Sequence, residues 1–130
     1  MPPGGGPPGS RPLTLRAVKA SQDPQAAWAQ DLRRWSRQFA ETTAIAHVSP
    51  RQRATVVGVV RRLRLLPGRS LEATVEDGTG RLTAEWLGRS RLPGVELGTG
   101  LRLGGTVAVD PDGRLRMRNP DYSTVAEPYA

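Results

Sequence analysis

The chain has no cysteine, and its 130 residues include a single histidine, His47. Without cysteine there can be no disulfide bonds, no thiolate catalysis and no cysteine-based zinc sites. No apolar run approaches the roughly 20 residues that span a bilayer, and the opening MPPGGGPPGSRP lacks the apolar core of a secretory signal. These absences fit a reducing cytoplasm, and we expect a cytoplasmic protein that does not bind membranes.

Motifs of catalysis and of cofactor binding are also missing. There is no Ser/His/acid signature, and the Gly-rich segment 104–107 does not follow the pattern of a phosphate-binding loop. The carboxylates Glu76, Asp77 and Glu85 show no spacing that requires a metal site or a catalytic pair, so we interpret them as solvated groups. We interpret His47 as a structural or surface residue. We therefore expect no enzymatic activity, no cofactor and no metal.

Aromatic residues are few, at 5% of the chain, and lysine is nearly absent, whereas arginine is abundant. Nineteen Lys and Arg residues stand against twelve Asp and Glu residues, a formal charge of +7, and eighteen of the nineteen are Arg. The planar guanidinium matches phosphate and stacks on bases, which favours a nucleic-acid partner. A GC-rich genome or a solvated surface would give the same excess, so charge alone leaves both interpretations open.

Two segments precede the main domain. Residues 1–21 are rich in Pro and Gly and show no hydrophobic period, which predicts a disordered, mildly basic tail. Residues 22–43 predict an amphipathic α-helix with Asp23 as N-cap and Pro24 at its first position, ending near residues 41–43. Spacings of four, three and four place four apolar side chains on one helix face: Trp28, Leu32, Trp35 and Phe39. This stripe must be covered by the following domain, by a partner protein or by a second copy of the chain.

The hydrophobic pattern changes to short strands after residue 44. Five strands are predicted, at residues 52–66, 70–77, 81–88, 101–109 and 114–118. Pro67-Gly68 and Asp77-Gly78 supply tight turns between the first three. An antiparallel set of this size needs closure to remove its edges, and the long first strand with Gly58 at its middle suits a five-stranded Greek-key barrel. A meander sheet packed on the helix is the competing architecture.

A series of motifs then occurs in a familiar order. They are Asp77-Gly78-Thr79-Gly80 after the second strand, Trp86 in the third, Gly98 or Gly100 before the fourth, Asn119-Pro120-Asp121-Tyr122 at the end, and the lead-in 45–48. Together they resemble the OB-fold nucleic-acid-binding family, and within it the wedge domain of the RecG DNA helicase and a set of small actinobacterial OB-fold proteins. The resemblance implies an all-β OB barrel over residues 44–125, with 126–130 as a C-terminal tail. The chain has no helicase motif, so the resemblance does not imply helicase activity.

Arginines recur where an OB-fold would bind a strand, which is the exposed face of its second and third strands and the loops around it. The candidate phosphate contacts are Arg61, Arg62, Arg64, Arg69, Arg81, Arg89, Arg91, Arg114, Arg116 and Arg118. The last three alternate with Leu115 and Met117, so they share one face of the final strand. Charge on an edge strand also prevents aggregation, so this set has two compatible interpretations.

Two aromatic residues and one acidic face remain ambiguous. Trp86 has the parity of the core residues of its strand, and its two interpretations are a core residue and a base-stacking residue. Tyr122 either stacks on a base or closes the bottom of the barrel. On the second strand, Glu72, Thr74 and Glu76 face outward, and carboxylates on a binding face repel phosphates.

The sequence as a whole predicts a non-enzymatic nucleic-acid-binding protein. It is expected to bind single-stranded or junction DNA through phosphate contacts with little sequence specificity. RNA is the close alternative. An alternative from a different functional class is a protein-interaction module that uses the barrel and the helix stripe of Trp28, Leu32, Trp35 and Phe39. The partner bound by this stripe is then another protein or a second copy of the chain.

Overall fold

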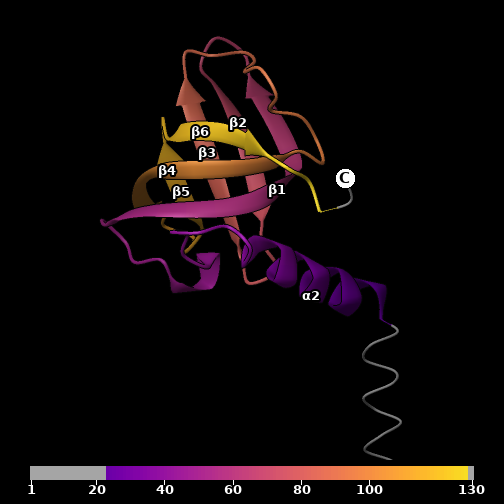
Figure 1. Cartoon of the computed structure of the whole chain (residues 1–130). Coiled ribbons are helices and arrows are strands. Elements are labelled where there is room, and N and C mark those ends of the chain that lie inside the picture. The colour runs from indigo at the N-terminus through magenta and orange to yellow at the C-terminus, as the bar shows by residue number, and fades with distance from the viewer. Residues whose placement is uncertain (1–22, 129–130) are drawn as a thin grey trace, which may run out of the picture.

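A computed structural model describes residues 23–128 of the chain, so the expected tail over residues 1–21 lies outside the described residues. The described residues begin with an α-helix, α2 (Pro24–Ser36), which is followed by a 3₁₀ turn, η1 (Ile45–His47). Six strands come next: β1 (Arg53–Leu66), β2 (Ser70–Glu76), β3 (Arg81–Leu87), β4 (Gly100–Val109), β5 (Leu115–Arg118) and β6 (Asp121–Val125). Figure 1 shows these strands curling into a barrel, with α2 alongside β1. No helix of the described part is long and apolar enough to cross a membrane.

Five of the strands close into a ring. β1 pairs antiparallel with β2 through its second half and with β4 through its first half. β2 pairs with β3, β3 pairs in parallel with β5, and β5 pairs with β4, which completes the circle. The parallel β3–β5 pair and the β1–β4 pair rule out the meander alternative. The chain therefore has the predicted fold, an OB barrel with an N-terminal helix.

Gly58 lets β1 serve both halves of the barrel. A Cβ at this position would lie 2.9 Å from Val75 Cβ and 3.1 Å from the Glu76 amide nitrogen, closer than ordinary contacts. The register of β1 against β2 also shifts between Val60 and Arg62, which marks a bulge. Glycine and bulge together bend the strand where it passes from β4 to β2.

The barrel interior is filled by the inward residues of every strand of the ring. On β2 the predicted alternation holds, with Leu71, Ala73 and Val75 buried. The rest of the core comes from Ile45, Val56, Val60, Leu82, Ala84, Trp86, Leu92, Val95, Leu101, Leu103, Val107 and Met117. Trp86 is the one aromatic side chain among these buried residues, so the volume of the core is supplied mainly by aliphatic side chains.

The predicted helix is shorter than residues 22–43. It ends at Ser36, whose hydroxyl donates to the Arg33 carbonyl, and residues 37–41 form turns. Phe39 therefore lies beyond the helix, although its spacing continues the stripe. Asp23 caps the start as expected, accepting from the Gln25 amide at 3.0 Å.

The barrel itself covers most of the apolar helix stripe. Leu32 and Trp35 are buried against Val57 and Val59, on the outer surface of β1. Trp35 Nε1 also donates to the Ala126 carbonyl oxygen at 2.9 Å. Of the covers considered for the stripe, the barrel is the one found.

The Asp77-Gly78-Thr79-Gly80 turn connects α2 and η1 to the barrel. The Asp77 carboxylate is buried and accepts from the amides of Ile45, Thr79 and Gly80 at 2.8–3.1 Å. Gly78 has φ +87°, and a Cβ there would lie 2.3 Å from the Ala29 carbonyl oxygen of α2. The motif is therefore explained by packing, since only glycine lets the helix approach this turn.

A sixth strand, β6, was not predicted. The sequence predicts the end of the domain at residue 125 and no strand over residues 121–125. In the structure these residues pair antiparallel with β4, with Tyr122 opposite Leu103. Asn119 has φ +49°, and this residue with Pro120 turns the chain from β5 into β6. β6 lies outside the five-stranded ring and extends the sheet beside β4.

Candidate nucleic-acid interface

A groove crosses the outer face of β2 and β3, with arginines on both sides. Its floor is formed by Glu72, Thr74 and Glu76 of β2 and by Thr83 of β3, and a hydrogen bond of 3.0 Å joins the two threonine hydroxyls. The arginines along it are Arg61, Arg62 and Arg64 of β1, Arg81 of β3, and Arg114 and Arg116 at β5. We call these residues the arginine groove. Its larger hollow has a volume of about 520 Å³.

Arg116 is bound by three carboxylates and differs from its neighbours. Its guanidinium lies 2.9 Å from Glu72 Oε2, 3.1 Å from Asp110 Oδ2 and 3.8 Å from Glu85 Oε1. Glu72 and Glu85 are direct cross-strand neighbours, an arrangement that is unfavourable without a cation between them. Burial lowers the pKa of Arg116, but hydrogen bonds to Glu72 and Asp110 outweigh it and raise the pKa above its ordinary value. Arg116 therefore stabilises the fold of this face.

This cluster corrects the prediction that Arg114, Arg116 and Arg118 are equivalent phosphate contacts. The Arg116 side chain is 19% exposed, whereas Arg114 and Arg118 are 76% and 72% exposed. Its carboxylate partners come from β2, from β3 and from the β4–β5 turn, so the difference is set by tertiary contacts. Arg114 and Arg118 remain the available members of the set.

The acidic face predicted on β2 is neutralised by arginines. Glu76 pairs with Arg81 and lies 3.9 Å from Arg61 Nη1. Glu85, which borders the groove, lies 3.7 Å from Arg118 Nε. Together with the contact between Glu72 and Arg116, every outward carboxylate of β2 and β3 has an arginine beside it. The floor of the groove is thus close to neutral, which removes the main objection to phosphate binding.

Arg62 and Arg64 are the arginines most available to a ligand. Both are exposed, and neither has a carboxylate within 4.0 Å among residues 23–128. Arg81, Arg114 and Arg118 form ion pairs, and their own side chains are at least 72% exposed. Asp112, the partner of Arg114, is also exposed, and such surface pairs contribute only about 0–1 kcal/mol, so this pair can be exchanged for a phosphate at small cost. Glu76 and Glu85, the partners of Arg81 and Arg118, are only 14–16% exposed, but each has a second arginine within 4.0 Å.

The remaining predicted arginines lie in loops at one end of the groove. The Gly88 amide donates to the Arg69 carbonyl oxygen at 2.7 Å, which joins the β1–β2 turn to the segment after β3. Arg69 and Arg89 are therefore carried by neighbouring loops, and both are exposed. Arg91 is exposed further along the β3–β4 connection.

Trp86 and Tyr122 close the barrel. Trp86 is 5% exposed, and its Nε1 donates to the Pro120 carbonyl oxygen at 3.0 Å. The half-buried Tyr122 ring packs edge-on against it at 5.6 Å, and the Tyr122 hydroxyl donates to the Pro93 carbonyl oxygen. The Trp86 ring is therefore not accessible for stacking on a base. Tyr122 packs against this ring and closes the end of the barrel.

No metal site is apparent within residues 23–128, where no three His, Asp or Glu side chains gather suitably for an ion. His47 is exposed in η1.

One feature of this region was not predicted from the sequence, namely that Trp28 of α2 lies beside the groove. The Arg61 guanidinium is 4.0 Å from the centroid of the Trp28 ring. The helical spacing groups Trp28 with Leu32 and Trp35, and only the tertiary structure separates it from them.

Comparisons with known proteins support the fold. No protein-family model and no curated protein matches the chain. Among solved structures, the OB domain of MM0293 from Methanosarcina mazei is 22% identical with a TM-score of 0.54, over 67% of this chain and 84% of that one. RecG bound to a three-way DNA junction is 17% identical with a TM-score of 0.55, over 67% of this chain and 13% of that one.

The p204 HINb domain is 18% identical with a TM-score of 0.54, over 65% of this chain. The chain spans only 47% of that structure and a small part of RecG. All three are below 25% identity, so the likeness is one of fold. It agrees with the expected resemblance to the OB-fold part of RecG, while a relation to small actinobacterial proteins stays a prediction.

Proposed function

We propose that the chain is a cytoplasmic, non-enzymatic protein that binds single-stranded or junction DNA along the arginine groove, through phosphates and with little sequence specificity. The observation that carries this proposal is the pair Arg62 and Arg64, which are exposed on one side of the groove, opposite the exposed Arg114, and have no carboxylate partner within residues 23–128. Cations on both sides of a groove track a phosphate backbone and read no base edges.

The chemistry of the floor supports a single strand. Thr74 and Thr83 are short and polar, so they leave room for bases above them and offer hydroxyl groups of either hydrogen-bonding sense. The available arginines stand at the sides, where the backbone of a strand would pass. The RecG structure, whose OB-fold part resembles this chain, is bound to a three-way DNA junction, which adds support for DNA.

The protein-interaction alternative has lost its main feature. It relied on an uncovered stripe of helix residues, but Leu32 and Trp35 are buried against β1. Only Trp28 and Phe39 are left partly exposed. The arginine groove therefore supports nucleic-acid binding better than the helix supports a protein partner.

Fluorescence anisotropy with labelled oligomers tests the proposal. Single-stranded DNA, duplex DNA, a three-way junction and single-stranded RNA are titrated with the protein at 50 and 200 mM salt. We expect single-stranded or junction DNA to bind tightest, with at least a tenfold loss of affinity between the two salts. Tighter binding of RNA would replace DNA as the substrate. Absence of binding at 50 mM salt with tens of micromolar protein would refute the proposal.

A further inference from the structure

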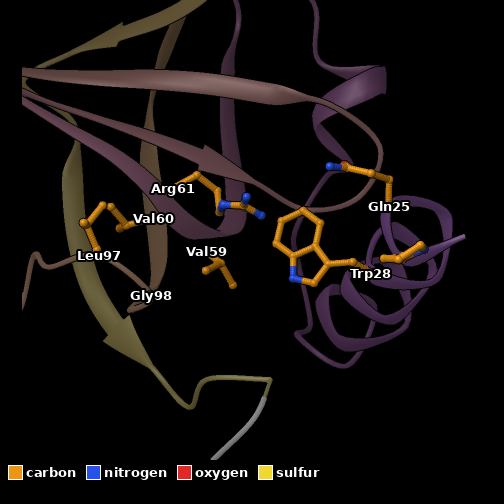
Figure 2. Close-up of a pocket in the computed structure, with 8 residues that line it drawn as sticks. Gln25, Trp28, Val59, Val60, Arg61, Leu97 and Gly98 are labelled. Atoms are coloured by element: carbon orange, nitrogen blue, oxygen red, sulfur yellow. The ribbon is translucent and has the colours of Figure 1, made fainter.

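A second hollow adjoins the arginine groove, between the first turns of α2 and the outer surface of β1. Figure 2 shows its lining residues, among them Gln25, Trp28, Val59, Arg61 and Leu97. Its volume of about 490 Å³ falls within the range of about 300–1,000 Å³ that small-ligand sites occupy. Apart from Arg61 and Gln25, the side chains around it are apolar. The hollow is therefore suited to a flat, mainly apolar group.

Trp28 differs from the other two tryptophans. Trp35 and Trp86 are buried, and each indole N–H donates to a backbone carbonyl oxygen. Trp28 is only half-buried, and its indole N–H has no hydrogen-bond partner among residues 23–128. Leu97, which also lines the hollow, is 66% exposed. A single exposed leucine is ordinary, but an indole and a leucine around one hollow form a partly uncovered apolar site.

Arg61 connects this hollow to the arginine groove, because its side chain lines both. The guanidinium lies over the Trp28 ring at 4.0 Å, so one ring face already accepts a flat group. Its contact with Glu76 is long, at 3.9 Å, and the Arg61 side chain is 46% exposed. Arg61 is therefore held loosely enough to turn towards a phosphate and uncover the ring.

We propose that the hollow binds one unpaired nucleobase of the strand that lies in the arginine groove. The base stacks on the face of the Trp28 ring that Arg61 now covers, Leu97 lines the far end of the hollow where the strand continues, and Arg61 turns to the phosphate that precedes or follows the base. This inference rests on the proposed function and narrows its substrate class to strands with at least one unstacked base. In an intact duplex both faces of a base are covered by its neighbours, so a base must be unpaired to enter.

The charge around the hollow favours a nucleic acid over a peptide. Arg61 lies at the hollow itself, and Arg62 and Arg81 continue along the adjoining groove. A neutral apolar peptide segment would make no contact that uses the charge of these cations. A nucleotide supplies a flat apolar ring and an anion at neighbouring positions, which matches the order of Trp28 and Arg61.

Tryptophan fluorescence gives a direct test, since Trp28 is the one tryptophan of the three that is not buried. Titration with oligo(dT) should quench the emission of the wild-type protein, and Trp28→Phe should abolish most of the quenching. Trp28→Ala should weaken single-strand binding by about 5- to 100-fold while leaving its salt dependence unchanged, because no phosphate contact is removed. An abasic site placed along the oligomer should weaken binding to the wild type but not to Trp28→Ala.

A second variant guards against loss of folding in α2. Leu97→Ala changes an exposed loop residue, and we expect it to weaken oligo(dT) binding by about threefold or more, whereas Leu65→Ala, at a position 50% exposed, should have no effect. Unchanged affinity in Trp28→Ala and Leu97→Ala, with salt-dependent binding intact, would overturn the base site and leave the groove proposal standing. Quenching by poly-glutamate but not by oligo(dT) would also overturn it. If the wild type binds no oligomer at all, the proposed function itself fails.

Discussion

Replacing Arg62 and Arg64 together by glutamine should remove about half of the salt dependence of single-strand binding. Both side chains are exposed beside the groove and lack carboxylate partners among the described residues, so their loss leaves no buried charge unpaired. Glutamine keeps most of the side-chain length and its polarity. Stability should therefore change by no more than about 0.5 kcal/mol.

The magnitude follows from the number of arginines available to phosphates. If Arg62, Arg64, Arg81 and Arg114, the exposed arginines of the groove other than Arg61, each contact one phosphate, log K falls with log salt at a slope of about −2.8 for a single strand. A rise from 50 to 200 mM then weakens binding about 50-fold. With two contacts left, the slope is about −1.4 and the same rise weakens binding about sevenfold. At 50 mM the variant should bind about 60-fold more weakly than the wild type.

A matched control separates the groove from net charge. Arg34→Gln with Arg37→Gln removes the same charge from α2 and its C-cap, where both side chains are exposed. Anisotropy at four salt concentrations between 50 and 200 mM gives the slope for each protein. We expect the control to keep the wild-type slope. An equal loss of slope in both double variants would show that binding follows overall charge, and the groove assignment would be wrong.

Three further substitutions test the scaffold of the site by urea unfolding. Arg116→Gln should lower the free energy of unfolding by about 2–3 kcal/mol, because three carboxylates lose their shared cation. Adding Glu72→Gln to this variant should restore part of the lost stability. Equal stability of Arg116→Gln and the wild type would refute the stabilising role of Arg116. Gly58→Ala should cost about 1–3 kcal/mol, since its Cβ meets β2, whereas Gly104→Ala has room and should not destabilise; similar effects at both positions would contradict this account of β1. Asp77→Ala should cost about 3 kcal/mol or more, because buried amides lose their acceptor, and a smaller loss would mean that water replaces it.

The fold was predictable because local signals agreed with one another. The alternation of Leu71, Ala73 and Val75 fixed which face of β2 is buried, and Asp77-Gly78 marked the following turn. Closure of the ring is a different matter. The parallel pairing of β3 with β5 joins segments whose local pattern says nothing of each other, and it was expected only from the resemblance to OB-folds.

Two element boundaries could not be predicted for physical reasons. Phe39 continues the helical spacing of Trp35, but the helix has already ended at Ser36, and a turn brings the ring to within 5.2 Å of Trp35. β6 gave no signal because only two of its five side chains, Tyr122 and Val125, are partly buried, and its strand character comes from backbone pairing with β4.

The sequence predicted the region of the site but not the role of each side chain in it. Arg116 and Arg118 lie two residues apart on one strand face, so no sequence pattern distinguishes them. Their roles differ because Glu72 and Asp110 reach Arg116 from other strands and from the β4–β5 turn. The exposure of Trp28 could not be predicted for a related reason. Helical spacing places Trp28 on the same face as Leu32, but the course of β1 decides which side chains of that face are buried.

The carboxylates of β2 and β3 finally bear on what kind of strand the groove can hold. Glu72, Glu76 and Glu85 are 14–16% exposed and lie beside arginines, so phosphates are disfavoured on the floor and favoured along the sides. A duplex presents two phosphate backbones on a wide, rigid surface, whereas a single strand can turn its bases towards Thr74 and Thr83 and its phosphates towards Arg62 and Arg64. Because several of the available arginines must leave an ion pair first, binding should be of moderate affinity and strongly salt-dependent, which the slopes of the arginine variants measure directly.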